Sequence, residues 1–186
     1  MLQPLTLALQ FLTRIPVPLS ADIPDEQTQG QSVLYYPLVG IIIGLLLCIL
    51  YWLTQGASSL LQATLILLLW VGVTGALHID GLADLADAWV GGQGDRDRTL
   101  EIMKDPRSGP LAVTAVVLLL LVKFAAIEAL ISNEIWAALL LVPMLGRGGL
   151  VAALQYIPYV RPQGLGETQA SNLPTAMATR VLLASA

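Results

Sequence analysis

The stretch VLYYPLVGIIIGLLLCILYW, residues 33–52, contains no charged side chain and is long enough to cross a bilayer as a helix. A backbone in hydrocarbon must satisfy its own hydrogen bonds, which only a helix or a closed barrel achieves. The stretch lacks the alternation of apolar and polar residues that a barrel strand shows. It therefore predicts a membrane-spanning helix, in which Gly40 and Gly44 have the spacing of a helix-packing face.

Three further stretches of mostly apolar residues have a similar length, at 60–77, 111–131 and 135–156. The composition agrees with them, since 56% of the 186 residues are hydrophobic, 12% are charged, and the mean hydropathy is +0.75. A soluble domain has roughly twice that share of charged residues. We therefore predict an all-α fold, a polytopic membrane helix bundle that forms a single membrane domain over residues 1–186.

Both ends of the chain carry shorter apolar segments. Residues 1–12 are too few to span a bilayer, but Leu5, Ala8 and Leu12 share one helical face, so we expect an interfacial or re-entrant helix there. From about residue 181 the sequence VLLA has the character of a fifth span that is cut short. We therefore expect a chain that is short at its C-terminus.

The basic residues predict an orientation in the membrane. From the segment before the first span to the segment after the last span, the numbers of Lys and Arg are 1, 0, 4, 0 and 2. Arg14 precedes the first span, four bases lie in 78–110, and Arg161 and Arg180 follow the last long span. Because cytoplasmic segments carry the excess of positive charge, the N-terminus, the 78–110 loop and the tail are predicted to be cytoplasmic.

The 78–110 loop holds half of all the charges, 11 of 22, and seven of these are acidic. The positive-inside rule explains the four bases but not the acids. Asp80, Asp84 and Asp87 are four and then three residues apart, which places them on one face of a helix about a turn from each other. We therefore expect a cytoplasmic helical loop with three carboxylates along one side.

Three like charges on one helix face repel each other, and a divalent cation would reverse that effect. Carboxylate oxygens suit Mg²⁺, which takes one or two of them and completes its shell with water and phosphate. The alternative is a solvated acidic face, but the chain uses charge too sparingly elsewhere to favour it. His78 is a candidate metal ligand, phosphate contact or base, and a capped interfacial histidine is the alternative.

A second cluster follows in the segment EIMKDPRSGP, residues 101–110. Arg107 offers a bidentate fork, Lys104 a point charge and Ser108 a hydroxyl, which together suit a phosphate. A juxtamembrane basic anchor is the alternative. Beside a magnesium site the phosphate interpretation gains weight, and the two clusters indicate a pyrophosphate or phosphodiester handled at the membrane surface.

Three ionisable residues fall inside the predicted spans, Lys123, Glu128 and Arg147. Residues at that depth are candidates for function by default. Lys123 and Glu128 are five residues apart, so we expect each to find partners on other helices, whereas Arg147 lies among glycines. A small membrane transporter would use these three residues as a substrate path, but it would not explain the aspartates.

Four segments of the sequence occur in an order that is familiar: FLTRIPVP at 11–18, PLVG at 37–40, HIDGLADLADA at 78–88 and IMKDPRSG at 102–109. Together they resemble the cobalamin synthase family, the adenosylcobinamide-GDP ribazoletransferases. The resemblance runs from about residue 8 to the turn at 164–166, and the aspartate block with its preceding histidine is its most specific part. Members of the family usually continue into further spans with a second acidic, glycine-containing motif, which these 186 residues lack.

The resemblance implies a transferase of the cytoplasmic (inner) membrane that takes part in cobalamin biosynthesis. Such an enzyme joins adenosylcobinamide-GDP to α-ribazole or its phosphate, releases GMP, requires Mg²⁺, and forms adenosylcobalamin or its phosphate. It implies Asp80, Asp84 and Asp87 as metal ligands and catalytic residues, with His78 as a further catalytic candidate. The candidate contacts to the substrate phosphates are Arg107, Lys104 and Arg14. Asp105 is a second-line candidate beside His78, and Asp105 and Arg147 complete the candidate cofactor-binding residues.

The nearest alternative enzyme is a CDP-alcohol phosphotransferase, which also uses aspartates at the membrane surface. Its pattern has Asp-Gly-x-x-Ala-Arg followed by widely spaced paired aspartates, which this sequence lacks. The partners that we expect are the two substrates and the lipid bilayer. No nucleic acid is expected, and a homo-oligomer is left open.

Overall fold

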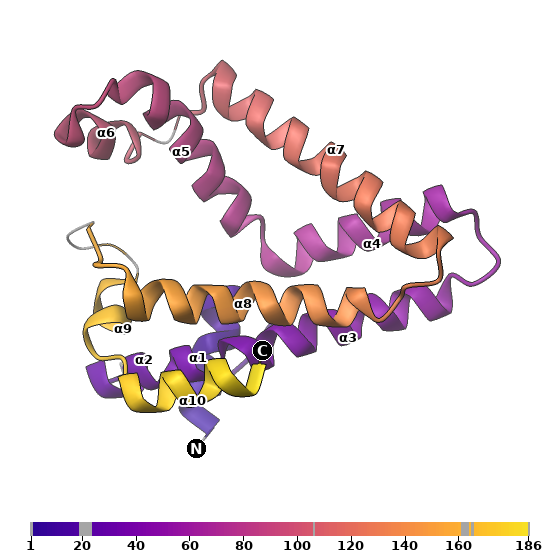
Figure 1. Ribbon diagram of the computed structural model, residues 1–186, viewed down its shortest axis with the longest axis horizontal. Helices are drawn as coiled ribbons and strands as arrows, with labels where there is room; N and C mark the ends of the chain where they lie inside the picture. Colours follow the sequence, from indigo (N-terminus) through magenta and orange to yellow (C-terminus); the bar gives the residue numbers. More distant parts are fainter. Residues whose placement is uncertain (1, 19–23, 106, 161–163, 165, 186) are drawn as a thin grey trace. The chain divides into compact units, whose positions relative to one another are not determined.

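A computed structural model of the chain describes residues 2–18, 24–105, 107–160, 164 and 166–185, and within these ranges every regular element is a helix (Figure 1). This confirms the all-α prediction. The chain divides into two compact units, one formed by Met1–Ala57 with Glu134–Ala186 and the other by Ser58–Asn133. That all of these residues form a single membrane domain stays a prediction.

The first unit is built from two long helices and several short ones. Its elements are α1 (Leu2–Leu12), α2 (Glu26–Ser32), the 3₁₀ turn η1 (Val33–Tyr35), α3 (Tyr36–Leu53), α8 (Ala138–Tyr156), α9 (Glu167–Ser171) and α10 (Thr175–Ser185). Helix α3 packs along α8, and α10 packs on the same α8 (Figure 1). Asp25 caps α2 by accepting a hydrogen bond from the Thr28 N–H. The side-chain and then the backbone hydrogen bond of Thr28 lower the pKa of Asp25.

Gly40 and Gly44 make the close approach of α3 and α8 feasible. A Cβ added at Gly40 would lie 2.5 Å from the Pro143 carbonyl oxygen, and one added at Gly44 would lie 2.7 Å from the Cα of Leu140. Both of these atoms belong to the backbone of α8, which cannot move aside as a side chain can. The predicted packing face at these two glycines is therefore confirmed.

The second unit contains the segment that carries most of the charges. Its elements are α4 (Ser59–Thr74), α5 (Leu77–Gly92), α6 (Arg96–Ile102) and α7 (Pro110–Ser132). Ser58 caps α4 through a hydrogen bond from the Leu61 N–H, and Pro110 begins α7 at a position where its missing N–H has no cost. Helix α7 packs against α4 along one part of its length and against α5 along another.

Three helical segments are long and apolar enough to cross a membrane: Glu26–Leu53, Pro110–Ser132 and Ala138–Tyr156. A fourth candidate is the pair α4 and α5 taken as one broken span. These segments agree with a polytopic helical membrane protein. Residues 2–12 form the predicted N-terminal helix, whose interfacial position stays a prediction, and residues 181–185 are the last part of α10.

The predicted span at 60–77 corresponds to α4, which ends at Thr74 and is followed by a bend of 84° into α5. The bend uses two consecutive residues with left-handed backbone, Gly75 with φ 60° and Ala76 with φ 57°. Glycine adopts this conformation readily, but in alanine the Cβ crowds the carbonyl oxygen at a cost of about 1–2 kcal/mol. Ala76 is therefore a strained position at the entry to α5.

Replacing Ala76 by glycine is expected to raise the free energy of unfolding by about 0.5–1 kcal/mol, because relief of the strain exceeds the added flexibility of the unfolded chain. Chemical denaturation in detergent measures this change. The matched control is Ala86→Gly in the interior of α5, which should lower the free energy of unfolding by about 1 kcal/mol. Equal losses in the two variants would contradict the left-handed conformation at residue 76.

Candidate functional site

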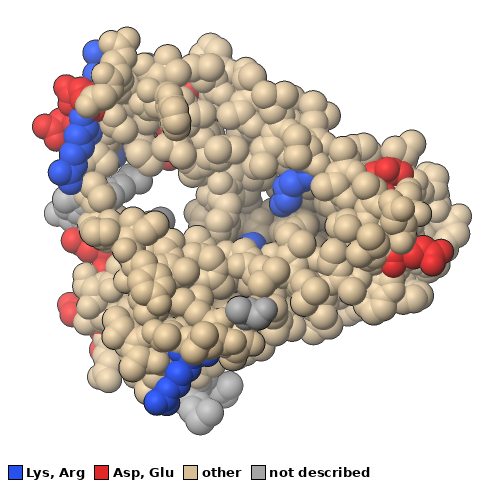
Figure 2. Space-filling model, in the orientation of Figure 1, with Lys and Arg blue, Asp and Glu red and all other residues tan. Residues whose placement is uncertain are grey.

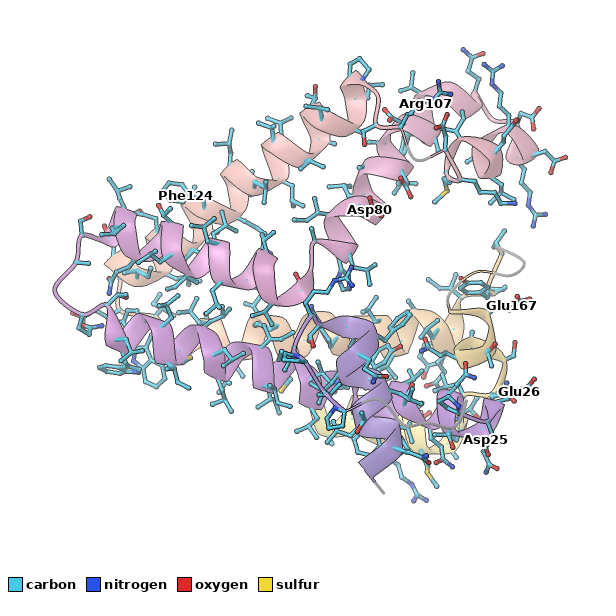
Figure 3. All side chains as sticks on the ribbon, turned by 180° about the vertical axis from the view of Figure 1, so that it is seen from behind. Asp25, Glu26, Asp80, Arg107, Phe124 and Glu167 are labelled. Carbon is cyan, nitrogen blue, oxygen red and sulfur yellow. The ribbon has the colours of Figure 1, made fainter. Side chains whose placement is uncertain are left out.

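Helix α5 carries all three predicted aspartates, as the spacing predicts. Asp80 lies in its first turn and is exposed, while Asp84 and Asp87 are half-buried. Figure 3 labels Asp80 on α5 and Arg107 in the segment between α6 and α7. His78, two residues before Asp80, is exposed at the start of the same helix.

Asp87 connects α5 to the start of α7. Its Oδ2 accepts a hydrogen bond from the Gly109 N–H at 2.5 Å, and its Oδ1 accepts one from the Ala112 N–H at 3.0 Å. Gly109 is the N-cap residue of α7 and has no side chain with which to satisfy these N–H groups. Asp87 therefore supplies the cap from a neighbouring helix, and its negative charge suits the positive end of the α7 dipole.

Glycine at position 109 is what allows Asp87 to approach so closely. A Cβ at Gly109 would lie 2.8 Å from Oδ1 and 3.0 Å from Oδ2 of Asp87, which is too close for either atom. The Asp87 carboxylate and Gly109 thus form a close contact between α5 and the start of α7. This link was not predicted from the sequence, where its local signal is a helix start at Gly109-Pro110 without a capping Ser, Thr, Asp or Asn.

The described residues contain no group of three or more His, Cys, Asp or Glu side chains that could hold a metal ion. Asp80, Asp84 and Asp87 therefore share a helix without being gathered around one point. Magnesium needs only one or two protein carboxylates, and the aspartates offer the oxygen atoms that it prefers, so their chemistry fits this ion. The magnesium ligands stay a prediction.

Arg107 and Asp105 form an ion pair. In the sequence they shortly precede Gly109, whose N–H donates to Asp87. Nη2 of Arg107 lies 2.8 Å from Oδ2 of Asp105, its Nε lies 3.1 Å from Oδ1, and its backbone N–H also donates to Oδ1 at 3.0 Å. The side-chain and then the backbone hydrogen bonds of Arg107 lower the pKa of Asp105 to about 2. The same contact raises the pKa of Arg107.

The segment around this pair is rich in charge and open to solvent. Lys104, Arg107 and Ser108 are all exposed. Figure 2 shows basic and acidic side chains gathered around α6, whereas most of the surface in that view carries neither. Arg107 is therefore charged and accessible, as a phosphate contact would need to be, and it is paired with Asp105.

Two of the charges inside the predicted spans have partners within the second unit. The Lys123 ammonium lies 3.8 Å from the centre of the Trp70 ring, and Glu128 accepts hydrogen bonds from Ser59 at 2.9 Å and Ser132 at 2.7 Å. Trp70 and Ser59 both belong to α4, so the prediction that Lys123 and Glu128 find partners on another helix is confirmed. Contacts between α4 and α7 account for these two charges without a substrate path.

The two remaining candidate binding residues lie in the first unit. Arg14 follows α1 and is exposed, whereas Arg147 lies in α8 with only 7% of its surface exposed. The predicted site residues thus fall into two groups. The second unit holds His78, Asp80, Asp84, Asp87, Lys104, Asp105 and Arg107.

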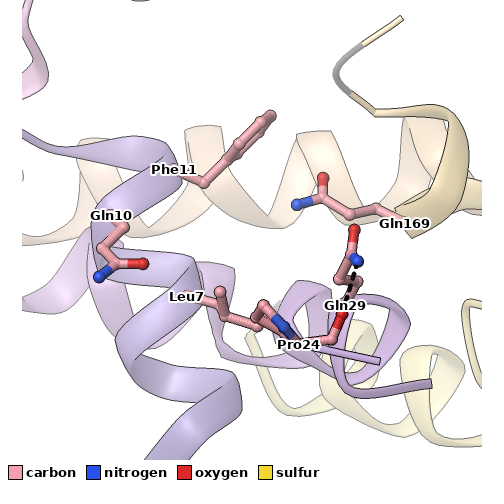
Figure 4. A pocket seen from close by; sticks show the side chains of 6 residues that line it. All are labelled: Leu7, Gln10, Phe11, Pro24, Gln29 and Gln169. Atoms are coloured by element: carbon pink, nitrogen blue, oxygen red, sulfur yellow. Dashed lines mark hydrogen bonds between the residues drawn. The ribbon is translucent and has the colours of Figure 1, made fainter. Parts of the chain in front are cut away.

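The first unit also contains a pocket of about 370 Å³ that the sequence analysis did not find (Figure 4). It is lined by Leu7, Gln10, Phe11, Pro24, Gln29 and Gln169. Gln169 accepts a hydrogen bond from the buried Tyr36 hydroxyl at 2.8 Å, and Phe11 stacks on the Tyr36 ring. The described lining residues supply an aromatic ring, three amides and no charge, which suits a neutral group better than a phosphate.

Comparisons with known proteins give the family. The family model described as Cobalamin-5-phosphate synthase matches residues 4–186. Among curated relatives, the adenosylcobinamide-GDP ribazoletransferase of Stutzerimonas stutzeri is 56% identical over 179 residues, which cover 96% of this chain and 73% of the relative. The protein of the same name from Pseudomonas putida strain F1 is 54% identical over 180 residues, 97% of this chain and 75% of the relative.

A third relative of that name, from Pseudomonas paraeruginosa, is 56% identical over 173 residues, which cover 93% of this chain and 70% of the relative. No solved structure matches the chain. The resemblance seen in the four sequence segments is therefore confirmed by matches that extend over nearly all 186 residues. The chain belongs to the cobalamin-5-phosphate synthase family, a family of enzymes.

Proposed function

We propose that this chain is a magnesium-dependent transferase that joins adenosylcobinamide-GDP to α-ribazole or its phosphate and releases GMP. The observation that carries the proposal is the aspartate helix α5, which Asp87 ties to the start of α7 just after the exposed Arg107. The names of the relatives support the two substrates. The product is adenosylcobalamin or its phosphate.

The reaction is a substitution at phosphorus. A ribose hydroxyl of α-ribazole attacks the cobinamide-side phosphorus of the pyrophosphate, and a new phosphorus–oxygen bond forms. The bond from that phosphorus to the bridging oxygen breaks, and its electron pair leaves with GMP. Such a transfer needs positioning and charge neutralisation more than covalent work by the protein.

The second unit offers residues for each of these tasks. We assign the magnesium ligands to oxygens of Asp80, Asp84 and Asp87, where a bound ion would neutralise charge on the pyrophosphate. One of these carboxylates, or the exposed His78 at the start of α5, accepts the proton of the attacking hydroxyl.

The cations bind the phosphate that leaves with GMP. Arg107 offers the guanidinium N–H groups that are not bonded to Asp105, and Lys104 offers its ammonium, both from the segment before α7. Arg14, exposed after α1, is a further candidate contact. We propose that the reaction takes place at the cytoplasmic face of the inner membrane, which the four bases of the 78–110 loop support.

The proposal is tested by incubating the purified protein with adenosylcobinamide-GDP, α-ribazole and Mg²⁺ and separating the corrinoid products. Adenosylcobalamin is the expected product, and a CDP-alcohol offered in place of adenosylcobinamide-GDP should release no CMP. A reaction that releases CMP and makes no corrinoid product would favour the CDP-alcohol phosphotransferase instead.

A further inference from the structure

The pocket of the first unit lies where α2 packs against both α1 and α9. Its lining residues are Leu7, Gln10 and Phe11 of α1, Pro24 and Gln29 at α2, and Gln169 of α9. Its volume of about 370 Å³ falls within the range of small-molecule sites, roughly 300–1,000 Å³. The proposed reaction uses none of these six residues, so the pocket has no role so far.

Gln169 is a buried polar side chain at the pocket, with 7% of its surface exposed. Its Oε1 accepts the hydrogen bond of the buried Tyr36 hydroxyl at 2.8 Å, and this contact fixes which end of the carboxamide is the acceptor. The Nε2 of Gln169 is turned toward α1 in Figure 4, and no described residue accepts a hydrogen bond from it. Gln169 therefore offers the pocket a donor of fixed orientation.

Gln29 supplies the pocket with an acceptor. Its Nε2 donates to the Pro24 carbonyl oxygen at 3.0 Å, which leaves its Oε1 for a ligand (Figure 4). The Gln10 side chain makes no hydrogen bond to a described residue, so its carboxamide can donate or accept. Leu7 and Phe11 add apolar surface from α1.

These side chains select a chemical class of ligand. A charged ligand would find no opposite charge among the described lining residues and would lose its hydration. A purely apolar ligand would cover the Gln169 N–H groups without offering them an acceptor, which is unfavourable. A group in which a carbonyl adjoins an N–H can bond to Gln169 and Gln29 at the same time.

We propose that this pocket binds a neutral amide, either a carboxamide or the lactam of a heterocyclic ring. The amide carbonyl accepts from Nε2 of Gln169, its N–H donates to Oε1 of Gln29, and the apolar remainder packs on Leu7 and Phe11. All of these residues belong to the first unit. The site therefore does not depend on the aspartate helix of the second unit or on the proposed function.

The test titrates four small probes into the purified chain in lipid nanodiscs and follows binding by saturation-transfer NMR, with empty nanodiscs as the blank. Benzamide carries a carboxamide and 2-pyridone a ring lactam, whereas acetophenone has the carbonyl alone and benzoate is charged. Benzamide or 2-pyridone should bind saturably and at least about five-fold more tightly than acetophenone and benzoate, and the tighter of the two identifies the source of the amide. Equal affinities for all four probes, or no saturable binding, would overturn the proposal.

Three variants locate the bound probe. Gln169→Glu keeps an acceptor for the Tyr36 hydroxyl but, as a carboxylate, has no donor, so it should weaken binding of the preferred amide at least about five-fold. Leu7→Trp fills the pocket and should abolish binding; it changes no hydrogen bond of the lining amides, so it keeps the test decisive if Gln169→Glu fails to fold. Gln27→Met, at an exposed position of α2 outside the lining, should bind as wild type does. Wild-type affinity in Leu7→Trp would overturn the proposal, because the amide would then bind elsewhere.

Discussion

Replacing Asp84 by alanine is expected to lower the rate of product formation by at least about 100-fold, a loss typical of removing one group that stabilises charge in a transition state. Asp84 is the middle carboxylate of the three on α5 and is half-buried, so no other aspartate can take its position on the helix. The measurement is the initial rate of adenosylcobalamin formation at saturating substrates. Asp97→Ala, which removes an exposed acid from α6, should keep the rate within about two-fold and is the matched control.

The dependence on magnesium separates a metal ligand from a residue that only supports the fold. Because Mg²⁺ binds few protein carboxylates, loss of one should raise the Mg²⁺ concentration needed for half-maximal rate. Asp84→Glu, which keeps the charge on a longer side chain, should retain more activity than Asp84→Ala. An unchanged rate and an unchanged magnesium requirement in Asp84→Ala would contradict the assignment.

Replacing Asp87 by alanine is expected to lower the free energy of unfolding by about 2–4 kcal/mol, since two hydrogen bonds from backbone N–H groups to a carboxylate are lost. Ala112 is buried, so its N–H would be left without an acceptor and without water. Chemical denaturation in detergent gives the free energy. Hydrogen exchange at the amides of Gly109 and Ala112 should speed up more than exchange elsewhere in α7.

Two further variants show which contacts of the Asp87 carboxylate contribute to the free energy of unfolding. Asp87→Asn keeps one acceptor oxygen and should lose about half as much stability. Gly109→Ala keeps the aspartate but places a Cβ 2.8 Å from its Oδ1, so it should also be destabilising. Wild-type stability in Gly109→Ala would contradict the close contact between residues 87 and 109.

The membrane helices could be predicted from the sequence because hydrophobic length is a local property. The uncharged run at 33–52 corresponds to α3 with its preceding turn, and the predicted spans 111–131 and 135–156 correspond to α7 and α8. The contact at Gly40 and Gly44 also follows from local spacing. In each case neighbouring residues carry the whole signal.

Features that depend on distant residues could not be predicted in this way. The cap that Asp87 gives to α7 joins residues 22 and 25 positions apart, and the spacing of Asp80, Asp84 and Asp87 indicates only that they share a helix face. The bend after Thr74 places an alanine in left-handed backbone, which its residue type does not favour. Nε and Nη2 of Arg147 are buried without a hydrogen-bond partner among the described residues, and this burial depends on packing between helices, which no local pattern encodes.

Release of GMP tests the proposed reaction most directly. Purified protein is mixed with adenosylcobinamide-GDP, and GMP is measured with α-ribazole and Mg²⁺ both present, with either one omitted, and after addition of EDTA. We predict that GMP appears in equal amount to the corrinoid product only when both are present, and that EDTA stops its release. GMP that forms without α-ribazole, or at an undiminished rate in EDTA, would contradict a magnesium-dependent transfer to the ribose hydroxyl.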